Sequence, residues 1–469
     1  MKSSIRKANL ESFHGILQDP VLFAKKILGH NVWSKQEEIL RSVATHPRTV
    51  VKACHASGKT FTAAELVAWW ITHRKNGIVI TTAPTWAQVE RVLWPEINKA
   101  VQDSKIDYPT TPTATSWKLG PNHYAIGLST NEGARFQGFH GDVLIIIDEA
   151  PGVRPQIFEA IEGIRAGGDV RVLMLGNPTI ASGPFYDAFS SNREGSNCIT
   201  ISAFETPNLQ GLTLESLLKL PDKELDNNPF PYLVSRRWVK EKYFEWGSGS
   251  PLWESRVLGN FPAQSEDALL SLTWLEMAKY REGGAYGAFH AGIDVGGPGE
   301  AETVLCVRQG QRIVYLKTWP DPDPRGEVVA ALNQFRDGLE TVNVDSVGIG
   351  DGIAKHLRDL RFPVQDINVG TRANDPDKFI NLKAELYWGL RLRAEEGDIS
   401  GLTDERTIAQ LAGIRYSHNA RGLIVIESKE EARKRGVKSP DRAEAVMLAY
   451  AGVLYAEPRI RIVRPRWTL

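Results

Sequence analysis

The chain has 469 residues, of which 42% are hydrophobic and 24% charged, and 56 basic residues balance 56 acidic ones. This length favours about two to three domains with apolar cores, and the composition excludes a disordered or fibrous protein. A net charge of zero excludes a uniformly basic surface, so any contact with nucleic acid must be local.

Three widely spaced cysteines, Cys54, Cys198 and Cys306, fit neither a disulfide framework nor a metal-ligand pattern. Their odd number and their spacing favour a reducing compartment. We see no apolar run with the length of a signal peptide or a membrane span. We therefore expect a cytoplasmic protein that is neither exported nor embedded in a membrane.

Between residues 48 and 177, apolar runs of strand length alternate with helix-like segments. This alternation predicts a parallel sheet covered by helices. Several of the runs lead directly into Gly, Ala, Pro or Asp, where α/β proteins place their ligand-binding groups. The predicted strands are 49–53, 78–82, 124–129, 143–147 and 170–175.

The first of these strands leads into the loop Ala53-Cys-His-Ala-Ser-Gly-Lys-Thr60 and a helix-like segment, 61–73. The spacing is that of G-x-x-x-x-G-K-[ST] with alanine in the first position. In such loops the backbone N–H groups and a helix N-terminus bind phosphates, the lysine neutralises them and the hydroxyl ligates Mg²⁺. Alanine is compatible with the first position if its φ is negative. The pattern predicts an ATP site that includes Ala53, Ser57, Gly58, Lys59 and Thr60.

The apolar strand 143–147 ends in two carboxylates, Asp148 and Glu149. In P-loop ATPases an aspartate in this context holds Mg²⁺, and an adjacent glutamate polarises the attacking water. We therefore predict that Asp148 is a metal ligand and Glu149 the general base. The two motifs together predict an N-terminal P-loop NTPase domain of the RecA/ASCE type, with helices on both faces of a parallel sheet.

Three further residues fit an ATPase of this kind. Gln36 precedes the first strand, where helicase-like ATPases place a glutamine that reads adenine. Asn177 follows the strand after the acidic pair, and we predict that it senses the γ-phosphate and couples hydrolysis to movement. Arg135 lies on a glycine-flanked loop and is either an arginine finger or an ordinary surface arginine.

A new strand-rich pattern begins at His290, with predicted strands 291–295, 303–308, 312–317 and 341–345 and helices 379–396 and 443–455. We predict an ATPase domain over 1–262, a linker over 263–285, an α/β domain over 286–456 and a basic tail over 457–469. The tail is either a solvated terminus or a contact for DNA or a partner.

Four acids give the second domain its chemistry. Asp294 interrupts an apolar strand, Asp345 closes a later strand, and Asp441 and Glu444 lie three apart at the start of the last helix. This order of acids is typical of RNase H-like nucleases, in which one metal ion activates water and a second stabilises the leaving oxygen. We predict that these carboxylates bind two Mg²⁺ or Mn²⁺ ions. Nearby basic residues either hold a phosphate backbone or form a solvated loop; they are Arg433, Lys434, Arg435 and Lys438.

These motifs make the chain similar to the large terminase subunit of tailed bacteriophages over nearly its whole length. The similarity also covers 256–262, Asn381-Leu-Lys-Ala-Glu385 and Pro440-Asp-Arg-Ala-Glu-Ala445. It implies ATP-driven translocation of double-stranded DNA into a procapsid, and cutting of DNA concatemers. The family often has a second aspartate where this chain has Glu444, so both Asp441 and Glu444 remain candidates for the primary metal ligand.

The same resemblance implies partners and a location. They are a portal protein, on which the chain docks as a homo-oligomer, and a small terminase subunit. The expected location is the host cell cytoplasm and, transiently, the portal vertex of the procapsid, but not the mature virion. Two other functions stay open at this point: a helicase-nuclease of DNA repair or mobile-element transfer, and an ATPase whose RNase H-like domain only grips DNA.

Overall fold

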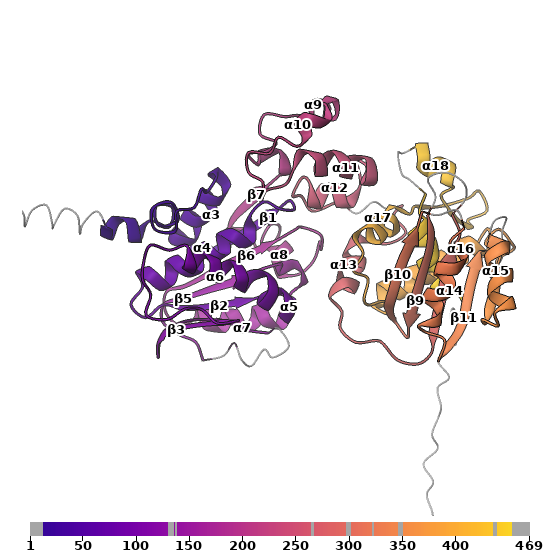
Figure 1. Cartoon of the computed structure of the whole chain (residues 1–469), viewed down its shortest axis with the longest axis horizontal. Helices are drawn as coiled ribbons and strands as arrows, with labels where there is room; N and C mark the ends of the chain where they lie inside the picture. The colour runs from indigo at the N-terminus through magenta and orange to yellow at the C-terminus, as the bar shows by residue number, and fades with distance from the viewer. Residues whose placement is uncertain are drawn as a thin grey trace, which may run out of the picture. The chain divides into compact units, whose positions relative to one another are not determined.

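The computed structural model describes residues 13–129, 136, 138–263, 267–296, 302–320, 323–345, 350–434 and 439–452. The chain forms two compact units, Met1–Ala263 and Gln264–Leu469, which Figure 1 shows in indigo to magenta and in orange to yellow. Arg135 and the predicted basic tail lie outside the described residues. In the part that is described, no helix combines the length and the apolar character that a membrane span requires.

The N-terminal unit is built on one sheet with the strand order β3-β4-β2-β5-β6-β1-β7. All neighbouring strands run parallel except β3, which is antiparallel to β4. The parallel strands bring their carboxyl ends to one edge. The strands are β1 (Arg48–Ala53), β2 (Ile78–Thr82), β3 (Ser116–Gly120), β4 (His123–Gly127), β5 (Val143–Ile147), β6 (Val170–Gly176) and β7 (Asn197–Ile201).

Helices cover both faces of this sheet. Ile157 and Ile161 of α7 share a buried cluster with alternate residues of β5 and β6, among them Ile145 and Val172. The intervening residues, such as Leu144, face the opposite side, where α4 contacts β2, β4 and β5. The helices are α2 (Pro20–Phe23), α3 (Ser34–Thr45), α4 (Lys59–His73), α5 (Trp86–Gln88), α6 (Trp94–Gln102), α7 (Pro155–Arg165), α8 (Pro184–Asp187), α9 (Leu214–Lys219), α10 (Asp222–Leu225), α11 (Arg236–Trp246) and α12 (Pro251–Arg256).

The sequence predicted the inner strands of this sheet and missed its two edges. The predicted 78–82 and 143–147 match β2 and β5, and the other predicted strands differ from the observed ones by one or two residues. The strands β3 and β7, which lie at the edges, were not predicted. Each is short and partly exposed, so it lacks the continuous apolar run that marks a buried strand.

The C-terminal unit contains a sheet with the order β10-β9-β8-β11-β12. The strands β8, β11 and β12 are parallel, whereas β9 is antiparallel to both β8 and β10. This is the RNase H-like arrangement that the order of acids predicted. The strands are β8 (Phe289–Asp294), β9 (Thr303–Gln309), β10 (Arg312–Trp319), β11 (Leu339–Asp345), β12 (Val364–Ile367) and a separate hairpin of β13 (Tyr416–His418) and β14 (Ile424–Ile426).

Helices α14 and α15 bury their apolar residues against one face of this sheet, and α19 contacts β8, β9 and β11. Segment 263–285, for which we predicted a linker, contains α13, whose Leu272, Leu275 and Ala278 are buried. The helices are α13 (Leu272–Tyr280), α14 (Arg325–Asn333), α15 (Gly350–Asp359), α16 (Leu382–Glu396), α17 (Glu405–Gly413), α18 (Lys429–Lys434) and α19 (Asp441–Ala449).

A glycine in β8 allows α19 to lie directly on the sheet. A Cβ atom at Gly292 would lie 2.2 Å from the backbone N of Ala449 and 2.3 Å from the carbonyl O of Ala445. Backbone atoms of a helix cannot move aside as a flexible side chain can. The absence of a side chain at Gly292 therefore sets how closely α19 approaches the strand that ends in Asp294.

We expect Gly292→Ala to lower the free energy of unfolding of the C-terminal unit by about 2 kcal/mol, because the added methyl group overpacks a backbone contact. Urea denaturation of the full chain measures this change. The matched control is Gly352→Ala in α15, where a Cβ would meet no atom within 4 Å and alanine favours the helix. Equal stability of the two variants would contradict the close approach of α19.

Candidate active sites

The loop after β1 has the backbone shape that phosphate binding requires. Gly58 adopts a left-handed conformation with φ of 83°, and its added Cβ would lie 2.5 Å from Nε2 of Gln36, so a glycine is needed there. Ala56 is also left-handed, with φ of 48°. Ala53, the last residue of β1, is not among the described non-glycine residues with positive φ, which meets the condition for alanine in the first position.

Two polar side chains of this loop, those of Ser57 and Lys59, are buried. The side chain of Lys59 is buried, and its Nζ donates to the carbonyl O of Cys54 at 3.3 Å. The hydroxyl of Ser57 is buried and has no hydrogen-bond partner among the described residues. A buried hydroxyl without a partner is unfavourable, so the loop is suited to a polar ligand such as phosphate.

The hydroxyl of Thr60 links the loop to the acidic pair Asp148 and Glu149. The carboxylate of Asp148 follows β5 and accepts from Oγ1 of Thr60 at 3.0 Å and from the backbone N–H of Glu149 at 3.1 Å. Glu149 itself is left-handed, with φ of 48°, a conformation that is uncommon outside functional sites for this residue type. The two residues for which we predicted Mg²⁺ binding, Thr60 and Asp148, are therefore in direct contact.

Burial dominates the electrostatics of Asp148. Burial contributes most to the rise in the pKa of this carboxyl, the neighbouring charge of Glu149 adds to it, Lys59 and Thr60 act in the opposite direction, and the resulting pKa is about 6. A divalent cation beside Asp148 would supply the positive charge that burial makes favourable. The donor set thus fits Mg²⁺ bound together with a nucleotide.

Two other predicted residues also touch the loop. Asn177, which follows β6, is buried and donates through Nδ2 to the carbonyl O of Ala53 at 2.6 Å. Because β6 lies between β1 and β5, Asn177 stands between the loop and the acidic pair. Gln36 donates to the carbonyl O of Gly58 at 3.4 Å and accepts from the N–H of Trp33 at 3.2 Å. Both ends of its amide therefore contact protein groups, and the role in adenine binding stays a prediction.

Parallel strands bring the first two acids of the C-terminal unit to one edge of its sheet. Asp294 is the last residue of β8 and Asp345 the last residue of β11, and these strands are parallel neighbours with Ile293 opposite Val344. Helix α19 starts with Asp441 and carries Glu444 one turn later. Since α19 contacts both strands, all four predicted acids lie at this edge of the sheet, and their charges interact.

The buried carboxylates act on one another. Burial raises the pKa of Asp294 well above its ordinary value, and the charges of Glu444, Asp441 and Asp345 raise it further. Like charges that interact at a buried site oppose one another's ionisation unless positive charge compensates them. A cation near Asp294 would therefore favour the ionised form of this carboxyl.

Two lysines hold Glu444. Nζ of Lys383 donates to Oε1 at 2.6 Å, and Nζ of Lys429 lies 3.0 Å from Oε2. Burial acts to raise the pKa of Glu444, but the two ammonium groups outweigh it and lower the pKa. The lysines thus supply positive charge at a site with four interacting acids.

Asp441 is held by neutral donors instead. Its Oδ1 is hydrogen-bonded to the hydroxyl of Ser439, and its Oδ2 accepts from the backbone N–H of Glu302 at 3.1 Å. The hydroxyl of Tyr387 is fully buried close to these acids and has no hydrogen-bond partner in the described part of the chain. This unsatisfied donor is a further sign that the cluster is built around a polar ligand.

Carboxylate oxygens suit hard cations such as Mg²⁺ and Mn²⁺. Among the described residues, no three side chains of His, Cys, Asp or Glu lie close enough together to hold a metal ion. The four acids share one edge and one electrostatic field, but the lysine contacts turn Glu444 toward Lys383 and Lys429. The residue types fit divalent cations.

The contacts of the two lysines were not predicted from the sequence. Lys383 belongs to the Asn381–Glu385 motif, and the basic side of the site was expected at residues 433–438. Residues 435–438 lie outside the described residues, as do the side chains of residues 433 and 434. Lys383 lies 61 residues from Glu444 in sequence, so no local pattern connects the pair.

The chain is similar in sequence to a curated protein over most of its length. No family model matches the chain. A probable large terminase subunit of Enterobacteria phage P7 is 26% identical over 92% of this chain and 90% of that protein. The alignment therefore spans both units.

Two solved structures are similar at a lower level. The large terminase of the HK97 bacteriophage has 14% identity and a TM-score of 0.40, and the match covers 92% of this chain and 98% of that one. The nuclease domain of the large terminase subunit of bacterial virus Sf6 has 18% identity and a TM-score of 0.33, covering 39% and 97%. Structural similarities of this size support no conclusion by themselves. The relationship to large terminase subunits therefore rests on the sequence match to the phage P7 protein.

The raised pKa of Asp148 predicts a pH-dependent stability in the absence of nucleotide and Mg²⁺. The folded pKa of about 6 exceeds the value of about 4 for an unfolded aspartate, so the folded state favours the neutral carboxyl. This stabilisation is complete below pH 4 and is lost as the pH rises through about 6. Between pH 4 and 7, we expect the free energy of unfolding of the wild type to fall by about 2 kcal/mol relative to that of Asp148→Asn.

Urea titrations of both proteins at the two pH values measure this difference. Titrating groups that do not interact with Asp148 are common to the two proteins and cancel in the comparison. Parallel pH profiles would show that Asp148 is ionised at its ordinary pKa in the folded protein.

Proposed function

The chain is a homologue of the large terminase subunits of tailed bacteriophages, and we propose that it is a DNA-packaging motor subunit that hydrolyses ATP and cuts DNA. One observation carries this proposal: a single chain joins a P-loop whose Thr60 contacts Asp148 to a second unit in which four carboxylates lie at one edge of the sheet and their charges interact. Each half accounts for one of the two activities that packaging requires. The sequence relationship extends over both halves.

In the N-terminal unit, we assign ATP binding to the loop from Ala53 to Thr60, with Lys59 neutralising the phosphates. Thr60 and Asp148 would hold Mg²⁺, which neutralises charge on the phosphate oxygens when it is bound. Glu149, beside Asp148 at the edge of the sheet, would take a proton from the attacking water. Asn177 would respond to the presence or loss of the γ-phosphate, and its hydrogen bond to the carbonyl O of Ala53 would transmit that change to β1.

In the C-terminal unit, we assign metal binding to Asp294, Asp345 and Asp441. Divalent cations bound there would activate water and stabilise the leaving oxygen of a phosphodiester. Glu444 is the weaker candidate for a primary ligand, since both of its oxygens already contact ammonium groups. Lys383 and Lys429 would instead face the phosphate backbone when a cation replaces them.

The substrate that fits these activities is double-stranded DNA. As in the family, we propose a portal protein and a small terminase subunit as partners, assembly as a homo-oligomer on the portal, and Mg²⁺ or Mn²⁺ as the nuclease metal. The proposed location is the host cell cytoplasm and, transiently, the portal vertex of the procapsid.

Separate substitutions in the two units test the proposal. We expect Lys59→Ala to reduce ATP hydrolysis by at least about 100-fold and to leave metal-dependent cutting of supercoiled plasmid unchanged. Asp294→Asn should abolish plasmid cutting with Mg²⁺ or Mn²⁺ and retain ATP hydrolysis. Both activities are measured on the full chain in the same buffer.

The outcomes separate the alternatives. ATP hydrolysis without cutting under either metal would favour a C-terminal unit that only grips DNA. Unwinding of a partial duplex by the wild type would favour a helicase-nuclease, because a packaging motor moves duplex DNA without separating its strands.

The assignment of the general base predicts a different defect for Glu149→Gln. The amide cannot accept a proton, so we expect the rate of ATP hydrolysis to fall by about 100- to 10,000-fold. Binding of a fluorescent ATP analogue should remain within about threefold, because Lys59, Thr60 and Asp148 are unchanged. An equal loss of binding and hydrolysis would move Glu149 from catalysis to nucleotide binding.

A further inference from the structure

The first turn of α19 carries two of the four acids but lacks a cap of its own. The residue before the helix is Pro440, which makes no side-chain hydrogen bond to the helix. The first N–H groups of a helix have no partner within it and must be satisfied from elsewhere. Here the partner comes from another helix.

Gln410 of α17 supplies this cap. Its Oε1 accepts from the backbone N–H of Arg442 at 2.8 Å and from that of Ala443 at 3.1 Å. Its Nε2 donates to the carbonyl O of Ser439 at 3.3 Å. A single amide therefore holds residues on both sides of Asp441, although Gln410 is 32 residues away from Arg442 in sequence.

The same contacts determine where the Asp441 carboxylate points. Ser439, whose carbonyl accepts from Gln410, places its own hydroxyl against Oδ1 of Asp441. The backbone N–H of Glu302 holds Oδ2 from β9's side of the site. A displacement of the first turn would break these bonds and move Asp441 and Glu444 together, since they lie on one helical face.

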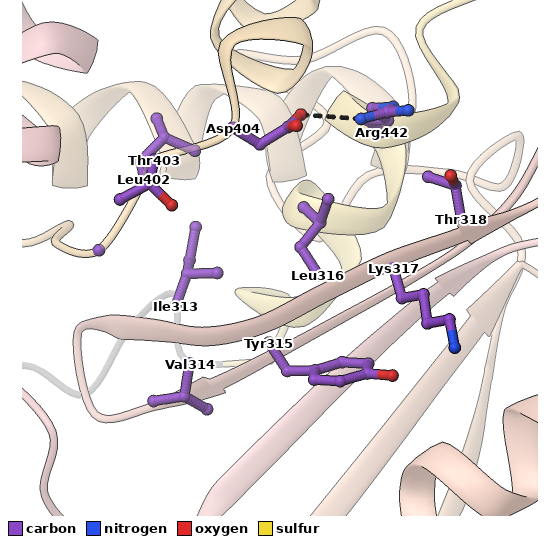
Figure 2. Close-up of a pocket in the computed structure, with 11 residues that line it drawn as sticks. Ile313, Val314, Tyr315, Leu316, Lys317, Thr318, Leu402, Thr403, Asp404 and Arg442 are labelled. Carbon is purple, nitrogen blue, oxygen red and sulfur yellow. Dashed lines mark hydrogen bonds and ion pairs between the residues drawn. The ribbon is translucent and has the colours of Figure 1, made fainter.

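A second link from the same side of the fold restrains the turn. Figure 2 shows the carboxylate of Asp404 facing the guanidinium of Arg442 above a groove beside β10, and the two groups are 2.9 Å apart. Asp404 also caps α17 by accepting from the N–H of Thr407 at 2.8 Å. Arg442 contacts Glu302 as well, at 3.3 Å. Helix α17 is thus joined to the start of α19 at two points, through Asp404 and through Gln410.

From this geometry we propose that Gln410 is a positioning residue of the nuclease site, which orients Asp441 and Glu444 for metal binding without touching the metal. The proposal rests on the nuclease function proposed above. Metal ligands must be held within about 0.5 Å of their productive positions, and groups that orient them change metal affinity by about 10- to 100-fold when removed. Gln410 contacts backbone on both sides of Asp441 and is placed to have this effect.

Three substitutions in the full chain test the proposal. Gln410→Met keeps the length of the side chain and removes all three hydrogen bonds. Gln410→Glu keeps an acceptor for the two N–H groups, and a carboxylate is favourable at a helix N-terminus. The control is Gln365→Leu, an exposed glutamine on β12 that belongs to neither α17 nor α19.

The primary measurement is calorimetric titration with Mn²⁺ alone, in which the heat lost in Asp294→Ala identifies the nuclease site. We expect Gln410→Met to weaken Mn²⁺ binding at this site by about 10-fold or more, and Gln410→Glu and Gln365→Leu to stay within about threefold of the wild type. Plasmid cutting by Gln410→Met should recover in part at raised Mn²⁺, whereas its ATP hydrolysis should equal that of the wild type.

Hydrogen exchange distinguishes positioning from general instability. In Gln410→Met, faster exchange should be confined to the amides at the start of α19, with β8 and β11 protected as in the wild type. Exchange that is fast throughout the C-terminal unit would overturn the proposal, as would wild-type Mn²⁺ affinity in Gln410→Met or equal losses in the Met and Glu variants. If the wild type itself neither binds Mn²⁺ through Asp294 nor cuts DNA, it is the proposed nuclease function that fails.

Discussion

Both sites depend on one constraint, which is that a carboxylate buried at the end of a strand needs positive charge or hydrogen-bond donors nearby. Asp148 meets this need with a hydroxyl, a backbone N–H and the nearby charge of Lys59. Asp294 is surrounded by other acids, which oppose its ionisation. In each unit the fold thus concentrates negative charge where water cannot screen it, and a divalent cation becomes the favoured counter-charge. The contacts that loops, helices and lysines make around the two strand ends all help to compensate this negative charge.

Much of this arrangement follows from local sequence. An apolar run that ends in acids predicts a buried strand with carboxylates at its carboxyl end, and this holds for Asp148 and Asp345. Parallel pairing of β8 and β11 then makes the proximity of Asp294 and Asp345 a consequence of sheet geometry. The P-loop was equally visible, because its backbone shape requires glycine at position 58. Strands at the sheet edges escaped prediction, since a half-exposed strand has no apolar signature.

Side-chain partners from distant helices could not be predicted in the same way. Lys383, Lys429 and Gln410 reach the site from α16, α18 and α17, and each contact depends on the direction of a side chain on a packed helix. Many lysines and glutamines on helix surfaces have the same local sequence character. Only the tertiary fold distinguishes those that meet a carboxylate or a helix terminus. The residues that contact and orient the acids are therefore harder to predict from sequence than the acids themselves.

The contact of α19 with Gly292 bears on how such a site can persist while a sequence diverges. The separation between helix and strand is set there by backbone atoms alone, without an intervening side chain. Exchanges among apolar residues on the opposite face, where α14 and α15 pack, change volumes that do not enter this contact. The core can accordingly accumulate substitutions while the acids on β8 and α19 keep their spacing.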